Sequence, residues 1–589
     1  MSSPVSAGLA LAAIGMTVLA AVAIGAYGNR ASRTPSDFYV ASRSVSPGLN
    51  ASAIGGEYLS AASFLGIAGL VLAYGVDMLW YPVGYTVGYL LLLVLVAAPL
   101  RRSGAFTIPD FAQGRLQSTR VRAVATALVV IIGWLYLIPQ MQGAGLTLGT
   151  VVGAPTWVGV LTVGLVVLSA VAGGGMRSIT LVQAFQYWLK LFAIAVPVFF
   201  LVAAWRADGS PDVLADTPPQ FGERTTVTMS SEVTLTIADA ITVQTAGSVD
   251  GEPVQGPLRL LPGEYTVGVD TTLVFPAGAT VPGVEAAPAL SGDEWGYPLS
   301  NGQSEPLYRV YSLMVALFFG TMGLPHVLVR FYTNPDGRAA RRTALTVLGL
   351  VGIFYLTPPI YGALGRLYTP ELLITGRTDA VVLTLPTAMV DGTGGQLLGA
   401  LVAAGAFAAF LSTSSGLVVS VAGVLSQDVL GRRGGSPRRT FRLATAIAVL
   451  VPVLLTLASQ RLGVASMVGL AFAVAASSFC PLLLLGIWWP RLTAPGAVAG
   501  LVSGGGLAAA AVLTTILLGP TDGWLGALLA QPAAWSMPLA FVTMVVVSRM
   551  TPRETPGGVQ RIMVRLHTPE SLGLDRGARL TGRGGRGGR

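Results

Sequence analysis

Cysteine, histidine and charged residues, on which many enzymes and disulfide-bonded proteins depend, are scarce in this sequence. The 589 residues include one cysteine, Cys480, and two histidines, and only 11% of the residues are charged. A lone cysteine within an apolar run excludes an intrachain disulfide. No HExxH or GxSxG run occurs on an apolar segment, so nothing points to a membrane hydrolase. We therefore expect neither an enzymatic activity nor a cofactor.

Lysine is almost absent too, since Lys190 is the single lysine among the 36 basic residues. The net charge is +9, but the arginines cluster in short connections and near the end of the chain. That placement indicates membrane topology and argues against nucleic acid as a partner. Hydrophobic residues make up 53% of the chain, and the mean hydropathy is +0.68. The lipid bilayer is therefore the expected surrounding, with residues 1–28 retained as a first span.

The apolar runs predict an all-α polytopic membrane protein of about 13 transmembrane helices. They lie near residues 5–28, 51–74, 79–100, 123–150, 156–174, 180–204, 308–331, 343–365, 392–424, 442–460, 464–489, 494–518 and 534–549. Arginine-rich connections alternate with arginine-poor ones, so the positive-inside rule puts the N-terminus outside and the C-terminus in the cytoplasm.

Two regions lack the apolar character. Between residues 205 and 307, the run TTVTMSSEVTLTIADAITVQT alternates at period two and predicts a small β-rich extracytoplasmic insertion. The insertion could be a structural cap or a module that captures solute. Residues 551–589 are rich in glycine and arginine and predict a disordered basic cytoplasmic tail.

Two apolar segments carry features that weaken a helix. In NASAIGGEYLSAASFLGIAG, from Asn50, the pair Gly55-Gly56 precedes Glu57 and two serines, which predicts backbone opened toward a cavity or, equally, a tight packing face. In LFFGTMGLPHVLVRFYT, from Leu317, two glycines and a proline predict a second break. Paired broken helices indicate an inverted-repeat secondary transporter. A third run, AAFLSTSSG from Ala408, offers hydroxyl oxygens of the kind that bind monovalent cations.

Together these runs resemble the sodium/solute symporter family, most closely its cation/acetate or monocarboxylate branch. The resemblance also includes SDFYVASRSVSPGL from Ser36, FTIPDFAQGRL from Phe106 and GGMRSITLVQAFQ from Gly174, and it covers residues 36 to about 490 outside the insertion. It implies a leucine-transporter-type fold. The expected division is an extra helix at 1–28, a first five-helix repeat at 36–204, the insertion at 205–307, a second repeat at 308–490, two further helices at 491–550 and the tail at 551–589.

The resemblance also implies where ligands bind. The sodium ligands would be the carbonyls of Gly56, Leu59 and Ala409 and the hydroxyls of Ser412 and Thr413. The solute would lie between the two breaks, beside Tyr58, Ser60, Ala61, Ser63, Thr321, Met322 and Gly323. Half-helix N-termini, which carry partial positive charge, suit a carboxylate there.

One departure from the family concerns charge. Many members have an aspartate where this chain has Gln183, so proton coupling is an alternative to sodium, with Glu57 as a replacement charge. Lys190 is a second intramembrane charge, which could face Glu57 or the solute, or be structural. A neutral His326 bonded to backbone is expected, and Asp110 and Asp428 would be helix caps or gate contacts.

We therefore expect a symporter of a bacterial plasma membrane that couples inward sodium or another cation to uptake of acetate, propionate or pyruvate by alternating access. The alternatives are a symporter of another small solute, such as an amino acid, and a solute-sensing membrane scaffold.

Overall fold

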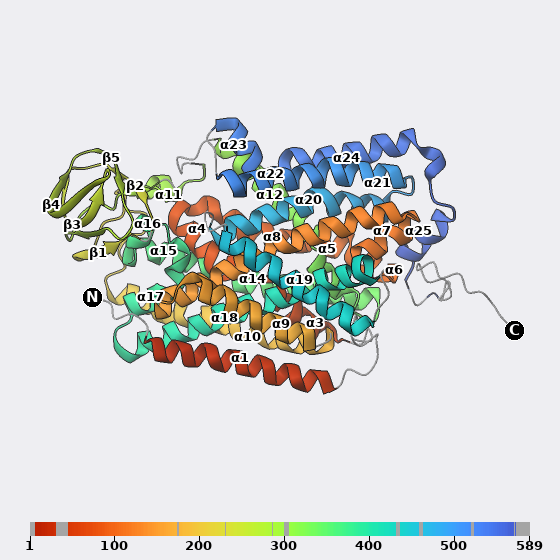
Figure 1. Cartoon of the computed structure of the whole chain (residues 1–589), viewed down its shortest axis with the longest axis horizontal. Coiled ribbons are helices and arrows are strands. Elements are labelled where there is room, and N and C mark those ends of the chain that lie inside the picture. The colour runs from red at the N-terminus through yellow and green to blue at the C-terminus, as the bar shows by residue number, and fades with distance from the viewer. Residues whose placement is uncertain are drawn as a thin grey trace.

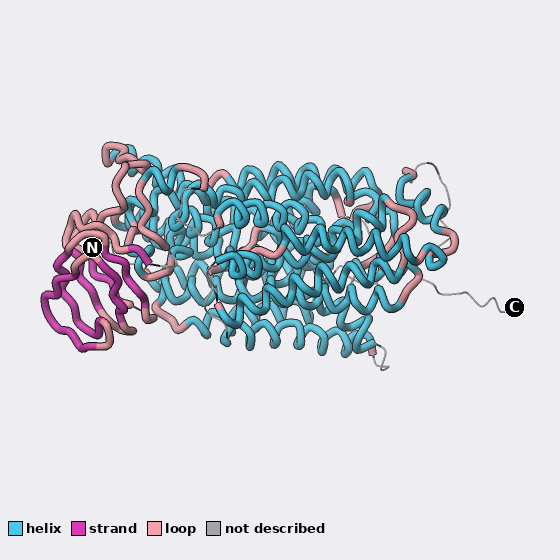
Figure 2. The backbone as a smooth tube through the Cα atoms, turned by 90° about the horizontal axis from the view of Figure 1, so that it is seen from above, coloured by secondary structure: helices cyan, strands magenta, loops and turns pink. Residues whose placement is uncertain are grey.

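A computed structural model describes residues 6–30, 45–173, 176–229, 231–284, 287–299, 305–431, 436–458, 463–519, 523–569 and 572. The helices run roughly parallel in an elongated bundle, with a β-sheet at one end and helix α25 at the other (Figure 1). The same separation of sheet and helices is visible after rotation by 90° (Figure 2). The motif residues 36–44, most of the arginines near residues 30–43 and the chain beyond 572 lie outside the described residues.

The first half of the bundle begins with α1 (Ala7–Arg30), which packs against the outside of α10 and α18. The elements that follow are α3 (Pro47–Tyr58), a π-helical turn (Ala62–Gly66), α4 (Ile67–Tyr74), a 3₁₀ turn (Gly75–Leu79), α5 (Trp80–Leu95), α6 (Ala97–Ser103), α7 (Ile108–Leu116), α8 (Thr119–Val152), α9 (Thr156–Gly173) and α10 (Met176–Ala207). Polar caps define several ends: the Thr107 hydroxyl accepts from the Asp110 amide at 3.2 Å and starts α7.

The second half begins after the sheet and a short capped helix, α11 (Gly292–Gly296). Its elements are α12 (Pro306–Gly320), a 3₁₀ turn (Thr321–Gly323), α13 (Pro325–Phe331), α14 (Gly337–Tyr355), α15 (Pro358–Tyr368), α16 (Glu371–Ile374), α17 (Val381–Met389), α18 (Gly392–Val424), a π-helical turn (Leu425–Leu430), α19 (Pro437–Ala458), α20 (Val464–Trp488), α21 (Ala494–Gly500), a π-helical turn (Leu501–Gly506), α22 (Leu507–Leu518), α23 (Gly523–Ala530), α24 (Ala533–Met550) and α25 (Val559–His567).

The number of spans differs from the sequence-based expectation. Within the described residues, ten helical stretches are long and apolar enough to cross a membrane, or eleven if the bent pair α12 and α13 is one span. The expected count of about 13 is not reached because Thr156–Ala172 is shorter than the others and because two predicted spans fall within the single stretch Ala62–Leu95. All thirteen predicted segments contain helix.

The insertion contains a sheet whose seven described strands are all paired antiparallel. The strands are β1 (Thr225–Thr228), β2 (Val233–Ile237), β3 (Ile241–Val249), β4 (Glu252–Leu260), β5 (Gly263–Val267), β6 (Thr272–Phe275) and β7 (Gly283–Val284). The order is β1-β6-β3-β5-β2-β7, with β4 beside β3. Buried and exposed residues alternate along β2, because successive side chains point to opposite faces of a sheet.

The segment after the sheet anchors the insertion to the bundle. The Trp295 indole donates to the Leu72 carbonyl at 3.2 Å, and the Leu299 amide donates to the Asp77 carboxylate at 2.9 Å. Gly75, at φ +73°, leaves the room that the Trp295 backbone occupies. The insertion is therefore joined to the α4 end of the bundle by specific contacts.

The start of the predicted disordered tail is helical. Helix α25 packs against α6, and the Arg102 guanidinium donates to the Leu566 carbonyl at 3.4 Å. The expectation of disorder from residue 551 is therefore wrong for Val559–His567. The hydrophobic side of this short helix, with Leu566 fully buried, explains why it packs despite the glycines and arginines that follow.

Candidate cation and solute site

The first broken helix opens after its glycine pair, not at it. Helix α3 continues through Gly55 and Gly56 to Tyr58, and Leu59 leaves helical geometry with ψ 88°. The helix resumes as a π-helical turn at Ala62. The glycines allow close packing instead: a Cβ on Gly55 would lie 2.8 Å from the Tyr187 ring, and one on Gly56 would collide with the Gln183 carbonyl of α10. The predicted break is thus correct, but its position at the glycines is wrong.

The break leaves backbone carbonyls without helical hydrogen-bond donors, and side chains donate to them instead. The Thr413 hydroxyl of α18 donates to the Glu57 carbonyl at 2.6 Å. The Lys190 ammonium of α10 donates to the Gly56 carbonyl and, at 2.6 Å, to the Leu59 carbonyl. Backbone groups inside a membrane need such partners, so these contacts stabilise the open backbone.

The Lys190 ammonium has a third acceptor, the Ser412 hydroxyl, at 2.9 Å. We call the Gly56 carbonyl, the Leu59 carbonyl and the Ser412 hydroxyl around this ammonium the ammonium site. The Ser412 hydroxyl in turn donates to the Ala409 carbonyl at 3.1 Å. All five predicted sodium ligands therefore lie together, linked to α3, α10 and α18. They are neutral oxygens, as a monovalent cation prefers, but a cation of the chain itself lies against three of them.

Glu57 pairs with an arginine that the sequence analysis did not single out. Its carboxylate lies 2.7 Å from the Arg330 guanidinium of α13, and both side chains are 2% exposed. Gly416 of the STSSG run makes room for this carboxylate, because a Cβ there would collide with it. The signal available in the sequence was Arg330 itself, a charged residue five positions after the helix-breaking proline.

Gln183 connects the arginine to the ammonium site. Its amide nitrogen donates to the Ser412 carbonyl at 2.7 Å, and its amide oxygen accepts from Arg330. Arg330 also donates to the Thr180 hydroxyl at 2.8 Å. The buried groups here are one carboxylate and two cations, so Gln183 adds hydrogen bonds without adding charge. The hydrogen bonds of the Lys190 ammonium go to the ammonium site, and the Glu57 carboxylate pairs with Arg330 instead.

The second broken helix meets the first. The stretch Pro306–Gly323, which is α12 with the turn Thr321–Gly323, is bent by 42° from α13 at Leu324, which has extended geometry. The Tyr58 and Thr321 hydroxyls lie 3.0 Å apart, and the Thr321 hydroxyl donates to the Leu317 carbonyl at 2.9 Å. Met322 and Gly323 are fully buried in this turn. The break expected from LFFGTMGLPHVLVRFYT is therefore present.

Several predicted solute residues line a buried aromatic cluster. The Tyr58 ring contacts the rings of Tyr85, Tyr89 and Phe472 at centroid distances of 5.7, 4.6 and 6.3 Å. The Ser63 hydroxyl pairs with Tyr355 at 2.8 Å, and the Ala61 amide donates to Gln140 at 2.9 Å.

Some polar groups of this cluster are unsatisfied. Among the described residues, the hydroxyls of Tyr85 and Tyr89 and both ring nitrogens of His326 are buried without a hydrogen-bond partner. The expected bond from His326 to backbone is thus not present. Buried polar atoms nearly always have partners, so these groups are candidates for contacts with a polar ligand.

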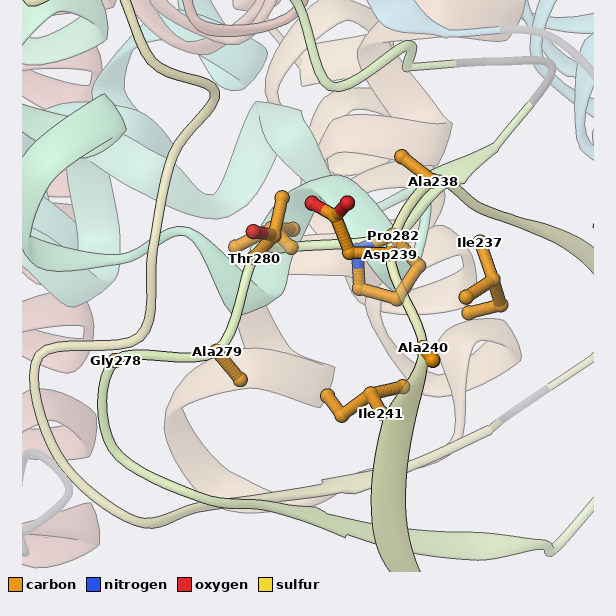
Figure 3. A pocket seen from close by; sticks show the side chains of 10 residues that line it. Ile237, Ala238, Asp239, Ala240, Ile241, Gly278, Ala279, Thr280 and Pro282 are labelled. Carbon is orange, nitrogen blue, oxygen red and sulfur yellow. The ribbon is translucent and has the colours of Figure 1, made fainter. Parts of the chain in front are cut away.

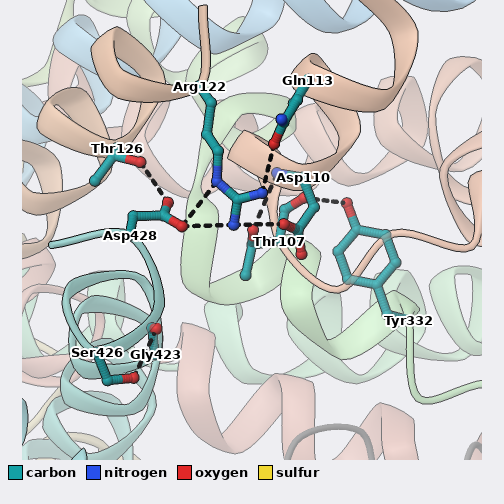
Figure 4. A network of polar contacts seen from close by, with 9 residues as sticks. All are labelled: Thr107, Asp110, Gln113, Arg122, Thr126, Tyr332, Gly423, Ser426 and Asp428. Carbon is teal, nitrogen blue, oxygen red and sulfur yellow. Dashed lines mark hydrogen bonds and ion pairs between the residues drawn. The ribbon is translucent and has the colours of Figure 1, made fainter. Parts of the chain in front are cut away.

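Asp110, in the first turn of α7, and Asp428, in the turn that follows α18, belong to one ion-pair network (Figure 4). The Arg122 guanidinium of α8 contacts Asp428 at 2.5 Å and Asp110 at 2.8 Å, and the Thr126 hydroxyl donates to Asp428 at 2.6 Å. Burial raises the pKa of the Asp110 carboxyl above its usual value, although Arg122 opposes that shift. The network joins α7 and α8 to the end of α18, so Asp428 is an inter-helix contact and not a helix cap.

A small cavity of about 200 Å³ lies in the insertion (Figure 3). Its lining comes from residues 237–241 and 278–282, and the charged side chain in it is Asp239. A carboxylate at this wall would repel an anionic solute. The cavity therefore gives no support for the insertion as a module that captures a monocarboxylate.

Comparison of sequences places the chain among transporters. The model of the sodium:solute symporter family matches residues 38–210 and 286–504, and the unmatched residues between include all seven strands. The chain is 30% identical to the uncharacterized symporter YwcA of Bacillus subtilis over 91% of this chain and 92% of that protein. It is also 30% identical to a monocarboxylic acid transporter of Corynebacterium glutamicum, over 86% and 85% of the two chains.

A solved structure shares the fold. The substrate-bound, outward-open state of a Na⁺-coupled sialic acid symporter matches with a TM-score of 0.60 at 14% identity, covering 92% of this chain and 98% of that one. At this identity the likeness concerns the architecture of the helices. The family and the relatives named here are transporters.

Proposed function

Because this chain belongs to the sodium:solute symporter family, we propose that it couples the inward flux of a cation to uptake of a short monocarboxylate such as acetate, propionate or pyruvate. Alternating access would expose the buried site between the two broken helices to each side in turn. The protein would lie in a bacterial plasma membrane with its N-terminus outside and its C-terminus inside. The insertion would act as an extracytoplasmic cap.

The observation that carries this proposal is the group of unsatisfied hydroxyls beside the two breaks. Tyr85 and Tyr89 have buried hydroxyls without partners among the described residues, and their rings contact Tyr58, whose hydroxyl pairs with Thr321. A hydroxyl can donate to a carboxylate, and a hydrogen bond to a charged acceptor is roughly twice as strong as one between neutral groups. The surrounding aromatic rings suit a short apolar tail, and the relative named as a monocarboxylic acid transporter supports the same solute class.

The cation of this proposal is sodium or a proton. Sodium is supported by the family and by the Na⁺-coupled neighbour. If sodium is the cation, its proposed ligands are the Gly56, Leu59 and Ala409 carbonyls and the Ser412 and Thr413 hydroxyls, whose chemistry suits a monovalent ion. The fit to sodium is incomplete, however, because the Lys190 ammonium lies against three of the five oxygens.

Uptake of radiolabelled acetate into proteoliposomes tests the proposal. An inward sodium or proton gradient should drive uptake, and unlabelled propionate and pyruvate should compete with it. Competition by an amino acid instead would favour the amino-acid alternative, and binding without uptake would favour a solute-sensing scaffold. Tyr89→Phe removes one unsatisfied hydroxyl and should raise the acetate concentration for half-maximal uptake about tenfold or more.

A further inference from the structure

The ammonium of Lys190 is bound as a free monovalent cation would be. An ammonium has three donors, and here all three are used by the ammonium site: two backbone carbonyls and one hydroxyl. The side chain is fully buried at the fifteenth position of the 32-residue helix α10, so it does not extend toward the membrane surface. Neutral oxygens, and no carboxylate, form its hydrogen bonds among the described residues.

A sodium ion would compete with this ammonium for the same atoms. Ions sharing the Leu59 carbonyl and the Ser412 hydroxyl would lie within a few ångströms of each other, where two like charges in a poorly solvated interior repel strongly. Among the described residues, Glu57 is the carboxylate that hydrogen-bonds within this network, and it is already paired with Arg330. Gln183 supplies no negative charge to offset a second cation.

We infer that Lys190 is a tethered cation that takes the place of sodium at this position. The natural chain then binds no sodium at the ammonium site, and removal of the lysine side chain uncovers a sodium site formed by the same oxygens. This inference rests on the proposed function for its meaning in transport, but it makes its own prediction about ion binding.

Equilibrium binding of radioactive sodium to the purified, detergent-solubilised chain tests the inference. Compared with the unsubstituted chain, Lys190→Ala should gain one saturable sodium ion per chain. Ser412→Ala in the Lys190→Ala background should weaken that binding about 10- to 100-fold, the effect of losing one hydrogen-bond-scale contact to a charge. Gln186→Ala is the matched control, because Gln186 is also buried on α10, one turn earlier, and its loss leaves the ammonium in place.

Two results would overturn the inference. One is an equal number of bound sodium ions in the unsubstituted chain and in Lys190→Ala. The other is sodium binding by the unsubstituted chain that Ser412→Ala weakens.

A second measurement needs no substitution. Since Lys190 is the only lysine, labelling lysine with ¹³C at the ε position gives one lysine signal in the NMR spectrum. That signal should stay unchanged when sodium replaces choline in the buffer, and a saturable sodium-dependent shift would contradict the inference.

Acetate uptake separates the two proposals. If the sodium binding is as expected but acetate is not taken up, only the monocarboxylate function is refuted. If acetate is taken up and the unsubstituted chain binds sodium at Ser412, only the tethered cation is refuted.

Discussion

Replacing Arg330 with methionine should destabilise the fold severely, because the Glu57 carboxylate would stay buried without its countercharge. Both side chains are 2% exposed and 2.7 Å apart, so little water is present to solvate the remaining charge. Breaking a buried ion pair costs about 3–5 kcal/mol in the free energy of unfolding. Arg330→Met also removes the donor to the Thr180 hydroxyl, so the upper part of that range is expected.

A double-mutant cycle separates the charge from the packing. In Arg330→Met with Glu57→Gln no buried carboxylate remains, so the double variant should be more stable than Arg330→Met alone, with a coupling energy of about 1–3 kcal/mol. Unfolding by titration with dodecyl sulfate measures these free energies. Arg341→Met is a control, because Arg341 is exposed on α14. A cost for Arg330→Met no larger than that of the control, or additive effects in the cycle, would refute the reasoning.

Three further predictions test other parts of the structure. Gly56→Ala should cost about 1–3 kcal/mol, because the new methyl group meets the backbone of α10, whereas Gly48→Ala in the same helix has open space and should be neutral or stabilising; thermal unfolding of both variants checks this. Asp428→Asn should raise amide hydrogen exchange in residues 425–430 about 10- to 100-fold, because the ion pair holding that turn is lost; unchanged exchange would contradict a stabilising role. Replacing residues 218–289 by a short Gly/Ser bridge, which keeps the Trp295 anchor, should preserve acetate uptake in proteoliposomes; lost affinity in a well-folded variant would favour solute capture.

The residue patterns within individual segments of the sequence predicted much of this architecture. Apolar runs located the helices, and period-two alternation located the strands of the insertion. The exact place of the first break was not predictable, since glycine weakens a helix and equally permits close packing. Only the approach of α10, which leaves no room for a Cβ on Gly56, shows that packing is the role of that residue.

Contacts between distant segments explain what the sequence could not reveal. Arg330 is 273 positions from Glu57, and Lys190 is 131 positions from Leu59. Their charges were visible in the sequence, but their partners depend on how α3, α10, α13 and α18 pack. The start of the tail was mispredicted for a similar reason, because composition alone does not include the surface of α6 on which α25 packs.

Uphill accumulation is the most direct test of symport. Proteoliposomes loaded with labelled acetate at the external concentration should concentrate it further when an inward gradient of the coupling cation is imposed, and should lose it when the gradient is reversed. An ionophore that collapses the gradient should abolish both changes. Acetate that only equilibrates, whatever the direction of the sodium or proton gradient, would contradict cation-coupled transport.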